Sequence, residues 1–466
     1  MKQYDLIILG GGAAAYAAAI KASEFNAKVA MVTNGILGGT CVNVGCVPSK
    51  HLLTVGEIYH YSKENNFKGI KLRQEYLNFS EVISQKDKLV EELRKEKYIE
   101  VLDFLPSVDL YKSSATFHSE NEVELNNEKE ILKADKFIIA TGSSPNIIKI
   151  PGIDKVDYLT NVEALNLKEM PESIIVIGGR ALGLEFAQMF AHFGSKVTVL
   201  QRSDRIIPEE EPEISYALKY YLEKEGIEIQ TGVAIKSVRS ESDYEYRKEG
   251  NKKIVTAEIK GNEMEFEGEQ LLMATGRKPN SNNLNLEKVG VKIKKNGAII
   301  VNSEMQTTSP NIYAAGDVIG DPMLETTAAK EGSIAAENAI RGTNKKMDYS
   351  AIPHAIFTHP QVASVGLTDK KAVEMGYECN CRTLKFSLVP KAAIIMDTRG
   401  LIKMVLDNKT KRILGVHILA PYASELIHEA TFAVKYKLTI HDIIDTVHIF
   451  PTLSESIKLV AQSFIK

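Results

Sequence analysis

The chain has 466 residues, which is too long for one ordinary hydrophobic core and predicts two to three domains. Hydrophobic residues make up 44% of it, charged residues 25%, and the formal net charge is -3 at pH 7, a balance that is typical of a globular protein and gives no sign of a nucleic-acid or anionic-membrane partner. Four cysteines cannot form a stabilising disulfide framework in so long a chain, so any disulfide is expected to be a working one.

The first predicted element is a βαβ unit at residues 4–33, YDLIILGGGAAAYAAAIKASEFNAKVAMVT. Gly10, Gly12 and Ala15 hold the three positions of a dinucleotide-binding fingerprint, in which the backbone approaches a pyrophosphate at a helix N-terminus. No basic region precedes the apolar run, and the run is too short to span a bilayer. We therefore expect a cytoplasmic protein without a membrane segment.

Residues 38–50, GGTCVNVGCVPSK, carry two cysteines that are separated by four residues. Such a pair can bind metal, staple the fold or act as a redox couple. A structural zinc site needs four ligands, and no second pair with zinc-ligand spacing follows. Helical spacing predicts that the sulfurs of Cys41 and Cys46 lie near one face, and the start of a helix lowers the pKa of a thiol. A redox couple is the favoured interpretation.

A second βαβ pattern occupies residues 173–202, SIIVIGGRALGLEFAQMFAHFGSKVTVLQR. Gly178 and Gly183 hold the outer fingerprint positions, and Arg180 stands where a middle glycine is expected. One fingerprint is weak evidence, because any tight turn from strand to helix favours glycine. Two fingerprints in one chain predict two dinucleotide sites.

Three further segments end apolar strands in small or polar residues. ATGSSPN (residues 140–146) and ATGRKPN (residues 274–280) each follow a strand, and TSPNIYAAGDV (residues 308–318) delivers Gly316 and Asp317 to a turn. The Asp317 carboxylate can bond a sugar hydroxyl of a cofactor, although an aspartate in this position is also a common turn cap.

Taken in order, these segments resemble the pyridine nucleotide-disulfide oxidoreductases, FAD enzymes that include dihydrolipoamide dehydrogenase, glutathione reductase and mercuric reductase. The resemblance covers nearly the whole chain. It implies an α/β fold with two Rossmann-like dinucleotide-binding domains and a C-terminal α+β dimerisation domain, hence a homodimer. The implied FAD domain comprises residues 1–146 and 270–340, the NAD(P)H domain residues 147–269, and the dimerisation domain residues 341–466.

The resemblance also implies roles for individual residues. Cys46 would lie against the flavin as a charge-transfer thiolate, and Cys41 would attack the substrate. Lys50 and Glu185 match an ion pair near the reactive flavin nitrogen. The expected FAD contacts are Gly10, Gly12, Ala15, Thr33, Gly39, Thr40, Thr141, Gly142, Gly276, Gly316 and Asp317. Thr33 stands where the family has a ribose-binding glutamate, so this anchor is neutral.

The nicotinamide nucleotide is expected at Gly178 and Gly183. A site that prefers NAD usually places an acid at the end of the second strand. Here the strand ends in Gln201, and Arg202 and Arg205 follow. Arginine binds phosphate through two parallel hydrogen bonds, so these residues favour the 2′-phosphate of NADPH, with NADH tolerated. Solvated arginines in a loop are the alternative.

Near its end the chain reads HIFPTLSE (residues 448–455), where thiol-oxidising and disulfide-reducing members carry HxHPTxxE. In that motif the second histidine is the proton-transferring base and the glutamate, here Glu455, orients it. Phe450 occupies the place of the base, and a phenyl ring cannot relay a proton. This argues against dihydrolipoamide dehydrogenase and glutathione reductase. His448 is a candidate substitute, or a packed or capping residue.

Mercuric reductase is the member whose reaction does not need that base, because thiolates bind Hg(II), which is then reduced to Hg(0). Soft thiolates suit a soft metal ion. Local strings resemble it as well: GGTCVNVGCVPSK, FAQMFAHFGSKVTVLQRS, LVPKAAIIMDTRGLIKMV and IKLVAQSF. The expected activity therefore passes electrons from NADPH through FAD and the Cys41/Cys46 pair to Hg(II), which Cys41 and Cys46 bind as substrate.

Two other functions stay open: a dihydrolipoamide dehydrogenase or other disulfide reductase, and a catalytically silent flavoprotein redox sensor. Retention of Cys41, Cys46, Lys50 and Glu185 together argues against the silent sensor. Two departures from the usual mercuric reductase are expected, namely a C-terminus without a vicinal cysteine pair and the lack of an N-terminal metal-binding domain.

The remaining cysteines, Cys379 and Cys381, form a CxC in a β-like segment. The period of two places both side chains on one face. The pair can bind Hg(II) or pack incidentally on a strand, and the sequence favours incidental packing.

Overall fold

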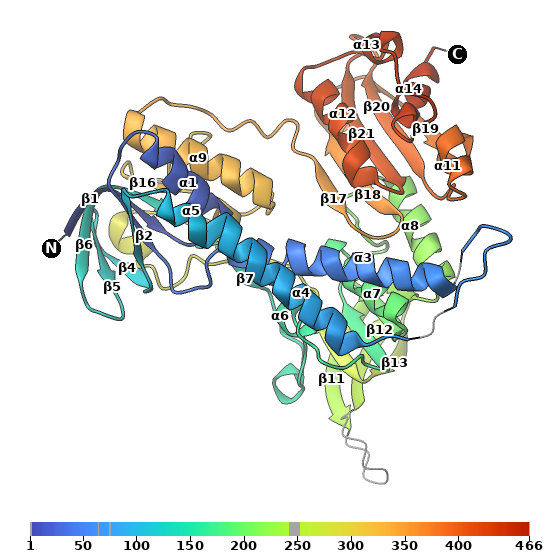
Figure 1. Cartoon of the computed structure of the whole chain (residues 1–466), viewed down its shortest axis with the longest axis horizontal. Coiled ribbons are helices and arrows are strands. Elements are labelled where there is room, and N and C mark those ends of the chain that lie inside the picture. Colours follow the sequence, from blue (N-terminus) through green and yellow to red (C-terminus); the bar gives the residue numbers. More distant parts are fainter. Residues whose placement is uncertain (1, 64, 74–75, 242–251, 466) are drawn as a thin grey trace. The chain divides into compact units, whose positions relative to one another are not determined.

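The computed structural model describes residues 2–63, 65–73, 76–241 and 252–465 and divides into two compact units (Figure 1). The first unit comprises Met1–Pro48, Ser84–Asn146 and Gly276–Asp348. The second unit comprises Ser49–Ile83, Ile147–Thr275 and Tyr349–Lys466. Each unit is therefore assembled from three separate stretches of the sequence.

A seven-stranded sheet forms the centre of the first unit. Its strands are β1 (Lys2–Leu9), β2 (Val29–Val32), β3 (Val108–Tyr111), β4 (Ala115–Ser119), β5 (Glu122–Leu125), β6 (Ile131–Ile139) and β16 (Ile312–Ala314). The strands β3, β2, β1, β6 and β16 pair in parallel in that order, while β5 pairs antiparallel with β6 and β4 pairs antiparallel with β5. Strands buried on both faces read as continuous apolar runs, as LIIL of β1 does.

Two helices of the first unit, α1 (Ala13–Ser23) and α9 (Glu325–Arg341), lie side by side (Figure 1). Their backbones approach so closely that a Cβ on Gly332 would lie 2.1 Å from the carbonyl oxygen of Ala14. Only a glycine fits there. The unit also contains α2 (Gly39–Val44), α5 (Glu100–Asp103) and the two-stranded ladder of β7 (Ser143–Pro145) and β15 (Arg277–Pro279).

Helices α3 (Cys46–Lys63) and α4 (Phe79–Arg94) each begin in one unit and end in the other. The second unit contains a parallel four-stranded sheet in the order β10-β9-β8-β14 and an antiparallel sheet in the order β11-β12-β13. Their bounds are β8 (Ser173–Ile177), β9 (Lys196–Gln201), β10 (Glu228–Thr231), β11 (Val233–Glu241), β12 (Lys252–Ile259), β13 (Asn262–Gly268) and β14 (Gln270–Met273). The helices of this part are α6 (Asn161–Ala164), α7 (Ala181–Phe193) and α8 (Pro212–Lys224).

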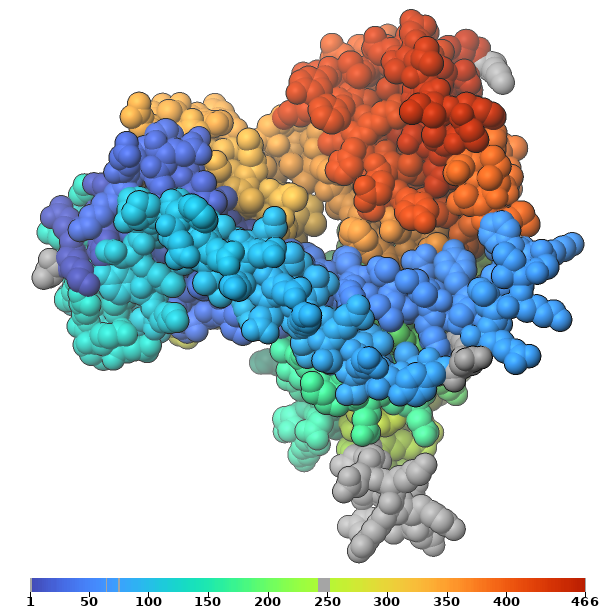
Figure 2. Space-filling view, in the orientation of Figure 1, coloured from blue at the N-terminus to red at the C-terminus, as the bar shows by residue number. Residues whose placement is uncertain are grey.

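The C-terminal part of the second unit is an antiparallel sheet in the order β17-β18-β21-β20-β19, covered by helices. The strands are β17 (His354–Ile356), β18 (Gln361–Gly366), β19 (Cys379–Lys385), β20 (Leu401–Asp407) and β21 (Ile413–Ala420). The helices are α10 (Asp369–Glu374), α11 (Pro390–Ile394), α12 (Ala423–Lys435), α13 (Ile440–Asp445) and α14 (Glu455–Gln462). They form one continuous lobe, orange to red in Figure 2.

The predicted fold class is confirmed, because a dinucleotide-binding type of parallel sheet occurs twice and an α+β segment follows at the C-terminus. The domain boundaries expected from the sequence stay a prediction. No helix in the described ranges is long and apolar enough to cross a membrane.

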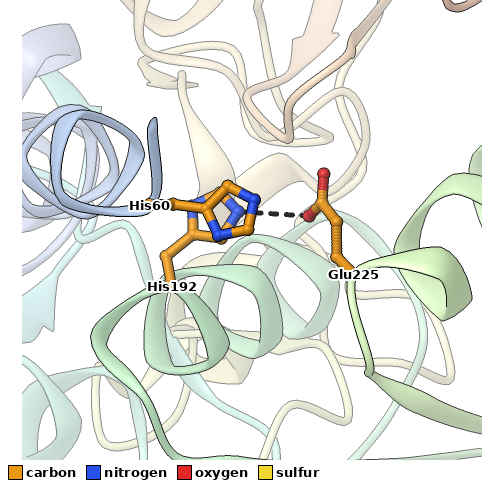
Figure 3. A group of neighbouring side chains, drawn as sticks. All are labelled: His60, His192 and Glu225. Atoms are coloured by element: carbon orange, nitrogen blue, oxygen red, sulfur yellow. Dashed lines mark hydrogen bonds and ion pairs between the residues drawn. The ribbon is translucent and has the colours of Figure 1, made fainter. Parts of the chain in front are cut away.

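A buried network of charges joins three elements of the second unit. Glu225 accepts hydrogen bonds from Gln188 at 2.6 Å and from Arg399 at 3.0 Å, and its carboxylate lies 3.1 Å from Nε2 of His192. Arg399 also binds both oxygens of Asp397, at 2.9 and 2.8 Å. Figure 3 shows the ring of His60 stacked on that of His192, with centroids 4.3 Å apart. The network holds α3, α7 and the residue that follows α8 together.

Burial opposes the ionisation of both carboxylates, yet their partners outweigh it. Hydrogen bonds from Arg399 and His359 lower the pKa of Asp397, and those from His192 and Gln188, with the charge of Arg399, lower the pKa of Glu225. A carboxyl whose folded-state pKa is lowered stabilises the fold above its unfolded pKa of about 4. That contribution is lost as the pH falls through the folded value.

Replacing Arg399 with Leu should lower the free energy of unfolding by about 3–5 kcal/mol at pH 7, because two buried carboxylates lose their cation. Chemical denaturation measures the loss, and the deficit should shrink below pH 4 as the carboxylates become protonated. Lys370→Met is the control. Lys370 and its partner Glu374 are exposed, so that variant should stay within about 0.5 kcal/mol of wild type. A deficit that is constant from pH 7 to pH 3 would contradict the assignment.

Candidate active site

The first glycine fingerprint forms a turn lined by backbone at the start of α1. Gly10 has φ +141°, and a Cβ there would lie 2.1 Å from the carbonyl oxygen of Ala140. Gly12 caps α1 without a side-chain hydrogen bond, and no acid occupies the first turn of the helix. Gly39, with φ +63°, approaches so closely that its Cβ would lie 2.9 Å from Cα of Gly12. This close backbone turn at a helix N-terminus fits the pyrophosphate of a dinucleotide such as FAD.

Two of the other expected FAD contacts pack around this turn. Ala15 is fully buried in α1. Thr33 lies against Gly11, where a Cβ would be 3.0 Å from the Thr33 hydroxyl oxygen, and that oxygen accepts a hydrogen bond from the amide of Gly35 at 3.2 Å. The neutral side chain thus lies at the end of β2 next to this turn, and it contributes no charge there.

The two ATG segments meet in the first unit. The Thr141 hydroxyl donates to the carbonyl of Asn280 at 2.7 Å, and the amide of Asn280 donates to the carbonyl of Gly142 at 2.9 Å. Gly142 and Gly276 have φ values of +71° and +97°, which glycine adopts without strain. These residues hold the strands β7 and β15 together. Their expected contribution to a cofactor site is to fix the position of the backbone in these two segments.

Arg277, which the sequence analysis did not single out, connects four segments of the first unit. Its guanidinium donates to the Ser143 hydroxyl at 2.6 Å and to the Thr40 hydroxyl at 3.3 Å. The Ser143 hydroxyl donates in turn to Asp317 at 2.5 Å. Asp317 lies in a turn and is also fixed by a side-chain hydrogen bond. The preceding Gly316 donates its amide to buried Glu331 at 2.8 Å.

Arg277 and Ser143 belong to the quoted strings ATGRKPN and ATGSSPN. The sequence does carry a signal for them. The two strings are similar, and Arg277 stands in ATGRKPN where the small Ser143 stands in ATGSSPN. A largely buried arginine needs hydrogen-bond acceptors, and Arg277 finds them in the hydroxyls of Ser143 and Thr40.

The two cysteines that are expected to form a redox pair lie on different helices. Cys41 is in α2, whereas Cys46 is the first residue of α3, with Gly45 between the helices. The expectation of helical spacing through both cysteines was wrong, because Gly45 breaks the helix where a Cβ would lie 2.8 Å from the carbonyl oxygen of Thr40. Both cysteines are free thiols; Cys46 is exposed and Cys41 is partly buried.

The thiols nevertheless interact. A hydrogen bond with Cys46, together with burial, raises the pKa of the Cys41 thiol, so the expected lowering by a helix start does not hold for Cys41. Glu325, the first residue of α9, adds negative charge in the same direction.

Tyr98 is a further residue near the thiols that sequence reasoning missed. Burial and the charge that Cys41 would carry raise the pKa of Tyr98 to about 12. Its ring packs edge-on against Tyr16 with centroids 4.9 Å apart, and a Cβ on Gly38 would lie 2.9 Å from it. Tyr98 is therefore a neutral phenol close to the thiol pair. No local motif marks it, since it comes from a segment more than fifty residues away.

The second unit brings Lys50 and Glu185 together, as the family resemblance implied. Lys50 Nζ lies 2.7 Å from Glu185 Oε2. The other Glu185 oxygen accepts the amide of Phe357 at 2.9 Å, and Lys50 Nζ lies 4.7 Å from the centre of the Phe357 ring. Glu185 is only 6% exposed, so both partners are needed to offset the loss of hydration.

The second fingerprint repeats the first in geometry. Gly178 has φ +119°, and a Cβ there would lie 2.2 Å from the carbonyl oxygen of Ala274. A Cβ on Gly183 would lie 1.9 Å from the carbonyl oxygen of Gly178. The first turn of α7 carries no acid, so its amide groups also fit a dinucleotide phosphate. Arg180 caps the helix in place of the middle glycine and pairs with Glu209 at 2.5 Å.

The residues expected to read the nucleotide follow β9. Gln201 is buried, and its side chain accepts the amide of Gly179 at 2.8 Å and donates to Ser203 at 2.5 Å. It therefore braces the glycine turn. Arg202 is exposed. Arg205 donates to the carbonyl of Pro208 at 2.6 Å, while its other terminal nitrogen is buried and has no hydrogen-bond partner among the described residues. An unpaired guanidinium nitrogen fits a phosphate oxygen.

The histidine and the glutamate of the C-terminal motif, His448 and Glu455, have different surroundings. His448 Nε2 lies 2.8 Å from Glu429 on α12, and its Nδ1 lies 3.0 Å from the carbonyl oxygen of Thr446. Glu455 begins α14, and its Oε2 is buried with no hydrogen-bond partner among the described residues. Phe450 is 67% exposed. Glu455 thus has no imidazole to orient, and His448 is held by a different acid.

Comparison with known proteins agrees with this arrangement. Residues 4–332 match the family described as pyridine nucleotide-disulphide oxidoreductase, and residues 352–461 match the dimerisation domain of the same family. The chain is 44% identical to a mercuric reductase of Lysinibacillus sphaericus over 99% of its own length and 83% of the relative. It is 40% identical to a mercuric reductase of Streptomyces lividans over 99% of its length and 96% of the relative.

Among solved structures, the chain is similar to the Cu(II) complex of the HOCl-induced flavoprotein disulfide reductase RclA from Escherichia coli. The TM-score is 0.87, the identity is 27%, and each chain is covered completely. With both family domains matched along the sequence, the chain belongs to the pyridine nucleotide-disulphide oxidoreductases, flavoprotein oxidoreductases that use FAD and a nicotinamide nucleotide.

Proposed function

We propose that this oxidoreductase reduces thiolate-bound Hg(II) to Hg(0) with electrons from NADPH. The balance is NADPH + Hg(II) → NADP⁺ + H⁺ + Hg(0), a transfer of two electrons. When bound, FAD would accept the hydride equivalent and pass the electron pair on. The chain's own part is to bind the two cofactors at the glycine turns of α1 and α7 and to hold the metal ion on Cys41 and Cys46.

The observation that carries the proposal is the absent base. Glu455 keeps the family position, but its Oε2 is buried without a partner in the described part of the chain, and Phe450 stands in place of the imidazole. Oxidation of a dithiol needs a proton acceptor at that place. Release of Hg(0) does not, since the ion gains electrons and leaves its two sulfurs. The high identity to mercuric reductases supports the same substrate.

The thiol pair suits this substrate as well. Hg(II) is a soft ion and prefers sulfur ligands. Cys41 and Cys46 are free thiols that share a hydrogen bond, so their sulfurs are close enough to bind one ion together. We assign the flavin-contacting thiolate to Cys46 and the substrate-directed thiol to Cys41.

Assembly as a homodimer is part of the proposal. The family's dimerisation domain is present, and it exposes large apolar side chains on and after α12. Phe432, Tyr436, Val447, Ile449 and Phe450 are between 62% and 92% exposed. Apolar groups of this size are usually covered by a partner.

The first test distinguishes substrate classes. Wild-type enzyme should oxidise NADPH with Hg(II) far faster than it turns over dihydrolipoamide or glutathione disulfide in a side-by-side panel. Comparable rates with dihydrolipoamide would refute Hg(II) as the preferred substrate and favour a disulfide reductase with His448 as its base. Failure of NADPH to reduce the bound flavin would indicate a silent scaffold.

Phe450→His should raise dihydrolipoamide turnover, because an imidazole beside Glu455 restores general base catalysis, which typically contributes about 10²–10⁴-fold. Steady-state kinetics measure the gain. Glu455→Gln in the Phe450→His background should remove most of it. Phe450→Leu, which loosens the site without adding a base, is the matched control and should show no gain; an equal gain with Leu would contradict the proposal.

The two cysteines should differ in their spectra after two-electron reduction. Cys46→Ser should abolish the long-wavelength charge-transfer band of reduced enzyme, whereas Cys41→Ser should retain or enhance it. The reason is that only the thiolate against the flavin contributes to the band. Anaerobic titration followed by absorbance measures the effect, and the opposite pattern would reverse the two assignments.

NADPH should exceed NADH in kcat/KM. Replacing Arg202 and Arg205 together with Ala should shrink that preference by about 1.5–3 kcal/mol, the worth of lost charge-assisted hydrogen bonds to a 2′-phosphate. Arg239→Ala removes a guanidinium that pairs with Glu265 on the antiparallel sheet and should leave the ratio unchanged. An unchanged ratio in the double variant would show that these arginines do not bind the phosphate.

A further inference from the structure

The CxC segment lies on an edge of the C-terminal sheet. Cys379 and Cys381 begin β19, which pairs antiparallel with β20 alone, Cys379 opposite Asp407 and Cys381 opposite Val405. Side chains two residues apart on a strand point to the same face. Both cysteines are partly buried free thiols. They are thus neighbours with ready access to a small solute.

A carboxylate faces these thiols. Asp369 is the first residue of α10, and the Sγ of Cys379 donates to its Oδ1 at 3.1 Å. One ligand atom from each of Asp369, Cys379 and Cys381 lies within 4.8 Å of the other two. The sequence favoured incidental packing of the cysteines on a strand. In the structure the Asp369 carboxylate accepts a hydrogen bond from the Cys379 thiol.

We infer that Asp369, Cys379 and Cys381 form a second binding site for a soft divalent metal ion, separate from the Cys41/Cys46 pair. Two sulfurs and one oxygen are a donor set for thiophilic ions such as Hg(II), Cd(II) and Zn(II). With metal–sulfur bonds of about 2.3 Å, two sulfurs on one ion lie at most about 4.6 Å apart, so the observed cluster needs only small side-chain shifts. Binding replaces two thiol protons with one ion.

The residues around the site hold its carboxylate in place. The backbone amide of Asp369 donates to Glu211 at 2.6 Å, which anchors the start of α10. Lys403 of β20 is held by Glu211 and Glu213 at 2.9 Å each, so the charge of this neighbouring cation is balanced by those two carboxylates. The thiolates and the carboxylate together carry a charge of -3, which a divalent ion largely neutralises.

The described residues contain one other group that is close enough to hold an ion, and its geometry is unsuitable. His60 and His192 stack with an interplanar angle of 12° and centroids 4.3 Å apart (Figure 3). An imidazole binds an ion in its own ring plane, and one ion cannot lie in two parallel planes. Glu225 is already bound by Gln188 and Arg399. This group serves the charge network described above.

The cysteine content of the chain makes a direct test possible. A Cys41→Ser/Cys46→Ser protein retains Cys379 and Cys381 as its only thiols, because the sequence has four cysteines. Titrated with Cd(II) against a competing chelator, it should bind one ion per chain with a near-ultraviolet thiolate-to-metal absorption band. Two protons should be released per ion. Flavin content and circular dichroism confirm that the variant is folded.

Two further changes in that background locate the site. Cys381→Ser should weaken Cd(II) binding at least 100-fold and abolish the absorption band, and Asp369→Asn should weaken binding by roughly 10–100-fold. Glu374→Gln is the matched control, since this carboxylate lies at the other end of α10 and pairs with Lys370. Binding that is as tight in Cys381→Ser as in the parent would overturn the inference, as would one ion shared between two chains.

The inference and the proposed function can fail independently. The titration uses no NADPH and a protein without the redox pair, so it reports only on the second site. If it shows one bound ion while wild-type enzyme gives no Hg(II)-dependent NADPH oxidation, the site stands and the proposed substrate falls. If turnover with Hg(II) is present and the titration shows no bound ion, the reverse holds.

Discussion

The buried carboxylate of Glu185 is the constraint on which much of the second unit depends. A charge that is 6% exposed is tolerated only with close partners, and these come from distant segments: Lys50 of α3 at 2.7 Å and the amide of Phe357 at 2.9 Å. The pair therefore fixes α3 on α7 and brings in the segment that leads to β18. The network around Glu225 and Arg399 secures the same helices farther along.

The second organising device is a glycine turn, used twice. Gly10 approaches the carbonyl of Ala140, and Gly178 approaches the carbonyl of Ala274, at nearly the same separation. In both places the alanine that begins an ATG segment supplies the carbonyl. The helix that follows each glycine turn has no acid in its first turn. Close backbone packing leaves no room for a side chain, so a phosphate can reach the helix N-terminus.

The C-terminal motif differs from that of the thiol-oxidising family members at one position, where the imidazole of the second histidine is absent. Phe450 stands in its place, and the Oε2 atom of Glu455 is buried with no hydrogen-bond partner among the described residues. In the proposed function the thiols bind the electron acceptor. A soft metal ion is matched to thiols and requires no proton relay. The inferred second site, formed by the cysteines of β19 and Asp369 beside them, would bind a soft ion through sulfur at the edge of the C-terminal sheet as well.

The sequence alone determined the features that depend on local spacing. Apolar strands running into glycine turns predicted both parallel sheets, and the order of the motifs predicted an α/β fold with a C-terminal α+β domain, which is confirmed. The spacing between Cys41 and Cys46 predicted a redox pair. It also predicted that one helix runs through both residues, which was wrong. Gly45 ends the first helix for a steric reason that residue counting does not reveal.

Only the tertiary structure decided which partner each polar side chain finds. Glu429 beside His448, Arg277 beside Ser143, and Asp369 beside Cys379 were not predicted. These contacts join segments that periodicity treats separately, and a charged side chain binds whichever acceptor the packed elements bring within about 3 Å. The physical reason is that spacing along the chain fixes which face a residue occupies, whereas its neighbours across that face are set by how the elements pack.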